Sequence, residues 1–118
     1  MSFTHTNYKF EREYPKLVRD RIPEIEKRQG GESARFRVIQ DGEEFFDYLA
    51  KKLIEESMEL RKSKVHGNFE EELADIFEVL DAILRLKKKT RRGIAAVQKK
   101  KRKERGGFKK RVLMLPRP

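Results

Sequence analysis

Two features of the sequence predict an all-α fold, a helical bundle with a minor two-stranded β element. Apolar residues between 42 and 88 recur at intervals of three and four, which is the period of an α-helix. Capping residues and glycines stand at the ends of these stretches. The length of 118 residues fits one compact domain. We place that domain at 15–118, behind a polar N-terminal arm at 1–14.

The first predicted elements are short. Pro23 suits the first turn of a helix, so we expect one from about Ile22 to Gln29, ended by Gly30-Gly31. The next segment, Ala34–Ile39, mostly alternates small or apolar residues with basic ones, which is typical of a strand. Arg111–Leu115 has the character of a second strand, and the two could pair.

The first long helix has a clear start. Asp41, followed by Glu44 three residues later, is a capping-box pattern. The helix behind it should reach about Lys62, and Ser63–Gly67 should form a turn.

Two further helices follow that turn. Asn68, with Glu71 three residues later, is the expected cap of a second long helix that runs to about Lys88. Thr90 is the expected cap of a fourth helix, and Gly106-Gly107 should stop it.

Charge is distributed unevenly along the chain. Thirty Lys and Arg against 20 Asp and Glu give a formal charge of +10, which attracts polyanions. Basic residues are dense from Arg85 to Arg111, and most acids lie between Asp41 and Asp81.

The absence of Cys excludes disulfides and thiolate metal sites. No stretch approaches the ~20 apolar residues of a membrane span, and the start lacks a signal-peptide pattern. We expect a cytoplasmic protein without a membrane partner.

The first long helix carries a carboxylate within its apolar stripe. Glu56 lies three residues after Leu53 and four before Leu60, inside an arc of roughly 60° on a helical wheel. A carboxylate there must be paired, protonated or bound to a cation, because an isolated buried charge is very costly. The stripe is predicted to comprise Phe46, Leu49, Leu53 and Leu60.

The second long helix has acids beside its apolar face. Glu72 and Asp75 lie next to that face, on a side that Val79 continues. The face itself is predicted to comprise Phe69, Leu73, Ile76, Phe77, Leu80 and Leu84.

A hairpin of the two helices would bring four carboxylates together. Antiparallel packing about a turn near His66 places Glu59 level with Glu72, and Glu56 level with Asp75. Their repulsion needs a counter-charge, and hard oxygen ligands suit Mg²⁺ or Mn²⁺. Two simpler interpretations stay open: solvated helix charge, or a buried carboxylate paired with Lys or Arg.

The motif around these acids resembles that of the MazG-like nucleotide pyrophosphohydrolases, a branch of the all-α NTP pyrophosphatases related to phosphoribosyl-ATP pyrophosphohydrolase. That motif is Glu-Glu-x-x-Glu, a spacer, then Glu-x-x-Asp. Here it reads Glu55-Glu56-Ser57-Met58-Glu59, twelve residues, and Glu72-Leu73-Ala74-Asp75. Two flanking blocks are also similar to one subgroup: Lys16 to Ile25 and Lys103 to Phe108.

The resemblance implies Mg-dependent hydrolysis of a nucleoside triphosphate to the monophosphate and pyrophosphate, as in house-cleaning of the nucleotide pool. It implies a metal held by Glu56, Glu59, Glu72 and Asp75, with Glu55 as a further catalytic candidate. It also implies a homodimer or homotetramer. The candidate phosphate-binding residues are Lys16, Arg19, Arg105 and Lys109. The candidates for a base-stacking residue are Phe45, Phe46, Tyr48 and Phe77.

Two alternatives remain. The flanking blocks make phosphoribosyl-ATP the less expected substrate, and a substrate comparison would separate the two enzymes. A non-catalytic nucleic-acid-binding or interaction protein is suggested by the basic stretch Lys87–Arg111, in which the helix Arg91–Arg105 is more basic than the resemblance leads us to expect. The regular aromatic residues of base-stacking surfaces are missing from that stretch.

Overall fold

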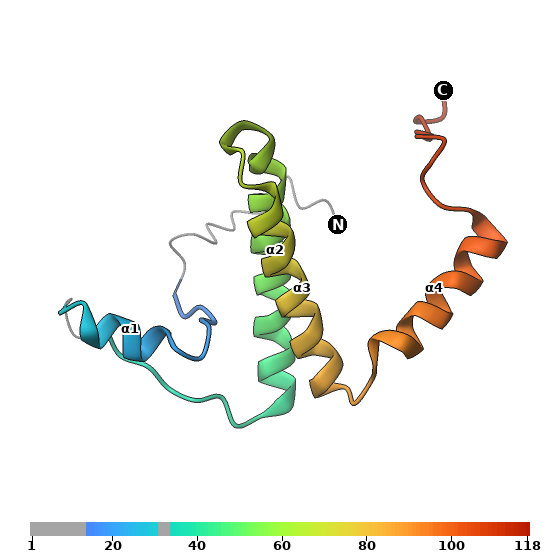
Figure 1. Cartoon of the computed structure of the whole chain (residues 1–118). Coiled ribbons are helices and arrows are strands. Elements are labelled where there is room, and N and C mark those ends of the chain that lie inside the picture. The colour runs from blue at the N-terminus through green and yellow to red at the C-terminus, as the bar shows by residue number, and fades with distance from the viewer. Residues whose placement is uncertain (1–13, 31–33) are drawn as a thin grey trace.

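Four helices make up the regular structure of the computed structural model, which describes residues 14–30 and 34–118. They are α1 (Ile22–Arg28), α2 (Gly42–His66), α3 (Phe69–Leu86) and α4 (Arg91–Arg105), shown in Figure 1. The described part of the chain is therefore all-α, as the sequence predicts.

The predicted two-stranded element is wrong. Neither Ala34–Ile39 nor Arg111–Leu115 is a strand, and the two segments lie on opposite sides of the α2–α3 hairpin (Figure 1). Both are exposed: Val38 is 79% accessible and Leu113 83%. With that separation, neither segment can supply the ladder partner that a strand requires.

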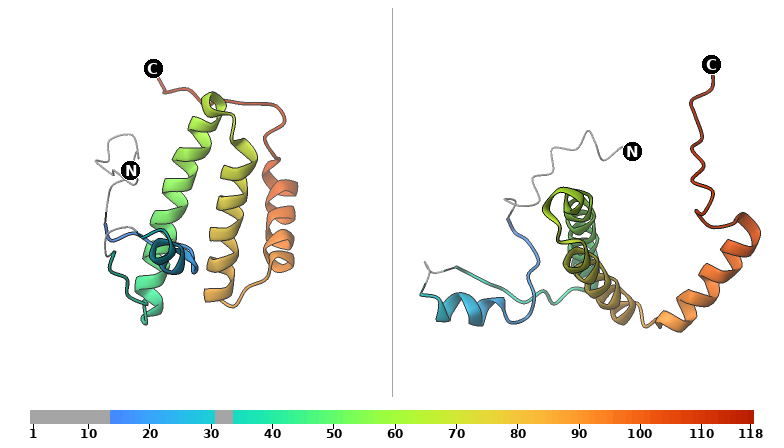
Figure 2. Two further views of the ribbon diagram at one scale, coloured as in Figure 1. Left: turned by 60° about the vertical axis from the view of Figure 1, so that its left-hand side comes forward. Right: turned by 45° about the horizontal axis from the view of Figure 1, so that its top comes forward.

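An antiparallel hairpin of α2 and α3 forms the centre of the molecule, as Figures 1 and 2 show. Among the described helices, only these two pack along much of their length. The buried hydrophobic residues of the described chain, Leu49 on α2 and Val79 on α3, both belong to this hairpin. Glu56 and Ser63 are the buried polar residues. One carboxylate thus belongs to a very small core.

The start of α2 follows half of the predicted capping box. The Asp41 side chain accepts a hydrogen bond of 3.0 Å from the Glu44 backbone N–H. The Glu44 carboxylate instead accepts two hydrogen bonds from Arg37, at 3.1 and 2.7 Å. This pairing lowers the pKa of Glu44, and it attaches the preceding segment to the first turn of α2.

The end of α2 lies one turn beyond the predicted Lys62. Ser63 is helical and only 3% exposed, and its hydroxyl donates to the Leu60 carbonyl at 2.6 Å. Gly67 ends the helix with φ 75°, and its N–H donates to the Ser63 carbonyl at 2.7 Å. Glycine adopts this left-handed conformation without the steric cost of a Cβ. The helix therefore continues to His66, and the turn is shorter than the predicted Ser63–Gly67.

Helix α3 turns a different side toward α2 than its strongest apolar face suggests. Val79, which lies on the side of Glu72 and Asp75, is 7% exposed. Phe69, Phe77 and Leu80, on the predicted apolar face, are 54%, 46% and 37% exposed. Leu73, Ile76 and Leu84, on the same face, are half-buried. One copy of the chain therefore covers only part of that face, and the carboxylate-bearing side makes the contact with α2.

Helix α4 projects away from the hairpin (Figures 1 and 2), and every residue in it is exposed. Thr90 caps it by accepting from the Gly93 N–H at 3.0 Å, as predicted. Arg91 joins it to α3 through two hydrogen bonds to Asp81, at 2.7 and 2.8 Å. In the described residues, no helix is long and apolar enough to cross a membrane.

Candidate functional site

Three carboxylates meet between α2 and α3. Oxygen atoms of Glu56, Glu72 and Asp75 all lie within 4.8 Å of one another. The helical period explains the arrangement, because Glu72 and Asp75 are three residues apart and share one side of α3. Antiparallel packing then places Glu56 of α2 opposite them. Three oxygen donors at this spacing could hold a metal ion.

Glu56 is the buried member of this group, with 8% of its surface exposed. Burial raises the pKa of its carboxyl to about 7, against the lowering effect of Lys52, and the negative charges of Asp75, Glu55 and Glu72 raise it further. The carboxylate is therefore poorly solvated and repelled by its neighbours. Both conditions favour a bound cation or a bound proton.

Two basic side chains supply part of the counter-charge. Lys52 Nζ lies 3.1 Å from Glu55 Oε2 and 3.6 Å from Glu56 Oε1. Arg19 Nη2, from the segment before α1, donates to Asp75 Oδ1 at 2.6 Å. The simpler interpretation, a buried acid paired with Lys or Arg, is thus realised in part. The two positive charges of Lys52 and Arg19 nevertheless serve four carboxylates. These are Glu55, Glu56, Glu72 and Asp75.

Asn68 positions one of the carboxylates. Its Nδ2 donates to Glu72 Oε1 at 2.8 Å, whereas its side chain makes no capping hydrogen bond to α3. Asn68 is therefore at the predicted N-cap position of α3, but its amide binds the side chain of Glu72 instead of the backbone. Asn68 Oδ1 is buried and has no hydrogen-bond partner.

Glu59, the fourth predicted metal ligand, lies outside the group of three. Lys62 Nζ is 3.5 Å from its Oε1, one turn along the same helix. Its role as a ligand stays a prediction.

The four predicted phosphate-binding residues divide into two pairs. Lys16 lines a pocket that Glu55 also lines, and Arg19 binds Asp75, so both lie next to the carboxylates. Arg105 ends α4 and Lys109 follows it, on the helix that projects away from the hairpin. Within one copy of the chain, the second pair is not brought to the carboxylates.

The sequence analysis does not identify Lys52 and the amide of Asn68 as site residues. Lys52 stands three and four residues before Glu55 and Glu56, a spacing at which helical side chains meet. That spacing could have identified it. Asn68 could not be identified, because its capping pattern suggested a backbone contact.

Comparison of the chain with models of protein families, with curated proteins and with solved structures found no match. The resemblance to the MazG-like pyrophosphohydrolases therefore stays a prediction from the motifs.

Proposed function

We propose that this protein is a metal-dependent hydrolase of nucleoside triphosphates that releases pyrophosphate and a nucleoside monophosphate. The main support is the group of three carboxylates around the buried Glu56, whose pKa is raised to about 7 by burial and by the neighbouring carboxylates. Perturbed carboxylates of this kind occur preferentially at functional sites.

The residues fit a divalent cation such as Mg²⁺ or Mn²⁺. All of the donors are carboxylate oxygens, the ligands these ions prefer. Glu56, Glu72 and Asp75 would hold it, with Glu59 as a fourth candidate. When bound, the cation would offset the charge that develops on the phosphate oxygens during hydrolysis.

The rest of the chemistry needs a proton acceptor and positive charge. Water attacks the α-phosphorus and pyrophosphate leaves with the bridging oxygen, or water attacks the β-phosphorus and the nucleoside monophosphate leaves with that oxygen. Glu55, held by Lys52 at 3.1 Å, is the candidate to accept the proton of the attacking water. Arg19 and Lys16 are the candidates to bind phosphate oxygens.

The test is pyrophosphate release from a panel of ribo- and deoxyribonucleoside triphosphates with Mg²⁺. Glu56→Gln and Asp75→Asn should each lower kcat/KM by more than about 100-fold, since even outer partners of a metal site contribute 10- to 100-fold. Glu70→Gln, an exposed acid on the first turn of α3, is the matched control and should retain activity. Full activity in both site variants would exclude the assignment.

Phosphoribosyl-ATP belongs in the same panel, and its preferential turnover would favour the alternative enzyme.

We further propose that the natural role is removal of unwanted nucleotides and that the active form is a homodimer or homotetramer in the cytoplasm. Self-association is supported by the exposed apolar surface of α3 and by the small buried core of one copy.

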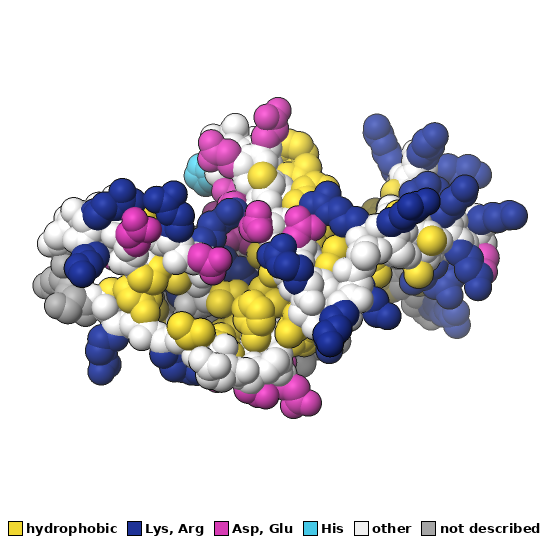
Figure 3. Space-filling view, turned by 60° about the horizontal axis from the view of Figure 1, so that its bottom comes forward, with side chains coloured by type: hydrophobic (Ala, Val, Ile, Leu, Met, Phe, Trp, Pro, Cys, Tyr) yellow, Lys and Arg dark blue, Asp and Glu magenta, His cyan; other side chains and the backbone are white. Residues whose placement is uncertain are grey.

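A second candidate function is nucleic-acid binding through α4. Eight of its fifteen residues are Lys or Arg, all exposed, and Figure 3 shows basic side chains crowded over this end of the molecule. Binding of duplex DNA or RNA that weakens steeply with salt, in a protein that hydrolyses no nucleotide, would favour this function. Replacing Lys99, Lys100 and Lys103 by Gln should then abolish the binding.

A further inference from the structure

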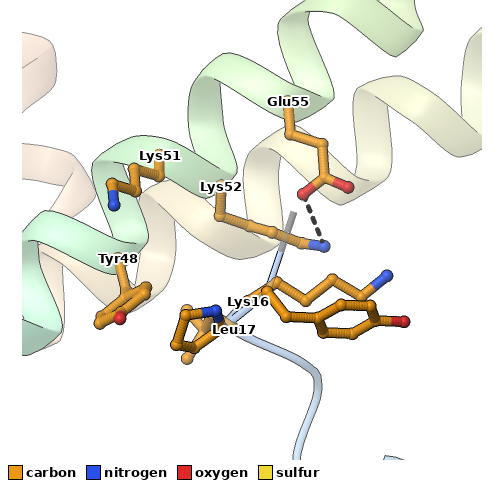
Figure 4. Close-up of a pocket in the computed structure, with 8 residues that line it drawn as sticks. Lys16, Leu17, Tyr48, Lys51, Lys52 and Glu55 are labelled. Atoms are coloured by element: carbon orange, nitrogen blue, oxygen red, sulfur yellow. Dashed lines mark ion pairs between the residues drawn. The ribbon is translucent and has the colours of Figure 1, made fainter. Parts of the chain in front are cut away.

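A small pocket lies beside the carboxylates, between α2 and the segment before α1 (Figure 4). Its volume is about 60 Å³. A space of this size holds a few water molecules, so it suits one or two phosphoryl groups and is too small to enclose a nucleoside. The lining residues are Tyr14, Pro15, Lys16, Leu17, Tyr48, Lys51, Lys52 and Glu55.

The pocket is positively charged. Three lysines, Lys16, Lys51 and Lys52, line it together with a single acidic residue, Glu55. In Figure 4, Lys52 points toward Glu55, and Lys51 lies at the Tyr48 end. A site with this balance attracts an anion. The neighbouring carboxylates of Glu72 and Asp75 could not do so without a cation.

Aromatic rings in the pocket already have cationic partners. Lys16 Nζ lies 5.4 Å from the centre of the Tyr14 ring, and Lys51 Nζ lies 5.2 Å from that of Tyr48. These contacts hold the ammonium groups near the pocket and cover ring faces on which a nucleobase would stack. The arrangement therefore favours phosphate over a base as the occupant.

Lys52 connects the pocket with the candidate metal centre. It lines the pocket and also lies 3.6 Å from Glu56 Oε1. A polyphosphate with one end at the carboxylates could extend past Lys52 into the pocket. The groups in the pocket would then be those released as pyrophosphate.

We propose that this pocket binds the β- and γ-phosphates of the nucleotide, the part released as pyrophosphate, through Lys16, Lys51 and Lys52. The proposal rests on the proposed function, which it deepens by naming the pyrophosphate site. It explains why cleavage would release pyrophosphate: the scissile bond lies between a phosphate at the carboxylates and two held by lysines.

The experiment measures binding of inorganic pyrophosphate to the full chain by calorimetry, with Mg²⁺ present. Lys16→Gln and Lys51→Gln should each weaken binding about tenfold, the lower range for a hydrogen bond to a charged group. Lys51→Arg should bind as the wild type does. Lys64→Gln, on an exposed part of α2, is the control for general loss of charge. Lys52 is not substituted, because it also pairs with Glu55 and Glu56.

Unchanged pyrophosphate affinity in the Lys16 and Lys51 variants, equal losses in the Lys64 variant, or no binding by the wild type would each overturn the proposal. The proposed function has a separate outcome, because turnover of nucleoside triphosphates is measured in parallel. If the protein hydrolyses nucleotides but the lysine variants bind pyrophosphate as the wild type does, only the pocket assignment is excluded. If pyrophosphate binding depends on the lysines but no nucleotide is hydrolysed, only the hydrolase assignment is excluded. Far-UV circular dichroism of each variant verifies that α2 is intact.

Discussion

Arg19 and Asp75 are 56 positions apart in sequence, and a hydrogen bond of 2.6 Å joins them. The guanidinium of Arg19 therefore binds one of the three carboxylates that could hold a metal ion. This contact links the segment before α1 to α3, and it places a phosphate-binding candidate directly on a metal-binding candidate. A cation at the carboxylates would compete with Arg19 for Asp75 and leave the guanidinium available to a phosphate.

The first prediction concerns Arg19→Gln. Without nucleotide, Mn²⁺ should bind up to about fivefold more tightly, because an exposed ion pair contributes up to about 1 kcal/mol. With nucleotide, KM should rise, because a phosphate partner is lost. Titration followed by the electron paramagnetic resonance of free Mn²⁺ measures the first effect, and steady-state kinetics the second. Arg21→Gln, whose side chain pairs locally with Glu24, should change neither. If Arg19→Gln weakened the binding of both Mn²⁺ and nucleotide, the proposed competition between the cation and Arg19 for Asp75 would be contradicted.

A second prediction follows from the pKa of about 7 at Glu56. Metal binding requires the deprotonated carboxylate, so below pH 7 the apparent Mn²⁺ affinity should fall about tenfold per pH unit. Above pH 7 it should level off. The measurement is a series of Mn²⁺ titrations between pH 5.5 and 8.5. In Glu56→Gln the step at pH 7 should vanish together with most of the affinity, whereas Glu70→Gln should retain both.

Stability without metal should depend on pH in the opposite sense. The folded state holds the Glu56 proton up to about pH 7, whereas the unfolded chain releases it near pH 4.5. The folded state therefore binds more protons between these values, and the free energy of unfolding decreases as pH rises through this window. The stabilising contribution of this proton is complete below pH 4.5 and is lost as pH rises through about 7, a change of about 3 kcal/mol.

Urea unfolding of the metal-free chain at several pH values, compared with Glu56→Gln, isolates this contribution. The difference in unfolding free energy between the two proteins should change across the window. A constant difference would show that Glu56 titrates normally.

Divalent metal should stabilise the hairpin. A ligand that binds only the folded state at 100 times its Kd adds about 2.7 kcal/mol. Saturating Mn²⁺ or Mg²⁺ should therefore raise Tm, and EDTA should reverse the increase. Asp75→Asn should lose the shift, whereas Lys64→Gln should retain it. An equal shift in the Asp75 variant would place the metal elsewhere.

The contact between α2 and α3 should depend strongly on Leu49, which is 2% exposed. Leu49→Ala should lower the free energy of unfolding by about 2–5 kcal/mol, the range for truncating a buried leucine. Leu113→Ala, at a position 83% exposed, should change it by less than about 0.5 kcal/mol. Thermal unfolding followed by circular dichroism compares the two. Similar effects in both would indicate that Leu113 is covered in solution, as the proposed homo-oligomer allows.

Helix positions, and the burial of Glu56, could be predicted because they depend on local patterns. Asp41 and Thr90 cap their helices as the sequence indicates, and Glu56 is buried where the helical wheel places it. These features need only the period of a helix and one antiparallel contact.

The details that were wrong or missed depend on competition between partners. Asn68 binds the Glu72 side chain instead of capping α3, and the Glu44 carboxylate binds Arg37 instead of completing a capping box. Each group had two possible partners at similar distance along the chain, and only the folded arrangement selects one. The two segments assigned as strands lie on opposite sides of the hairpin, which no local pattern reveals.

The hairpin carries the whole candidate metal centre in a short piece of chain. Glu56 and Asp75 enclose only 18 residues, and their contact spans a single turn at Gly67. Helical hairpins with such local contacts fold among the fastest of all structures. The three carboxylates can therefore come together during synthesis as soon as α3 has emerged from the ribosome, before α4 and the C-terminal segment have emerged. Metal acquisition would then be an early step in the maturation of the nascent chain.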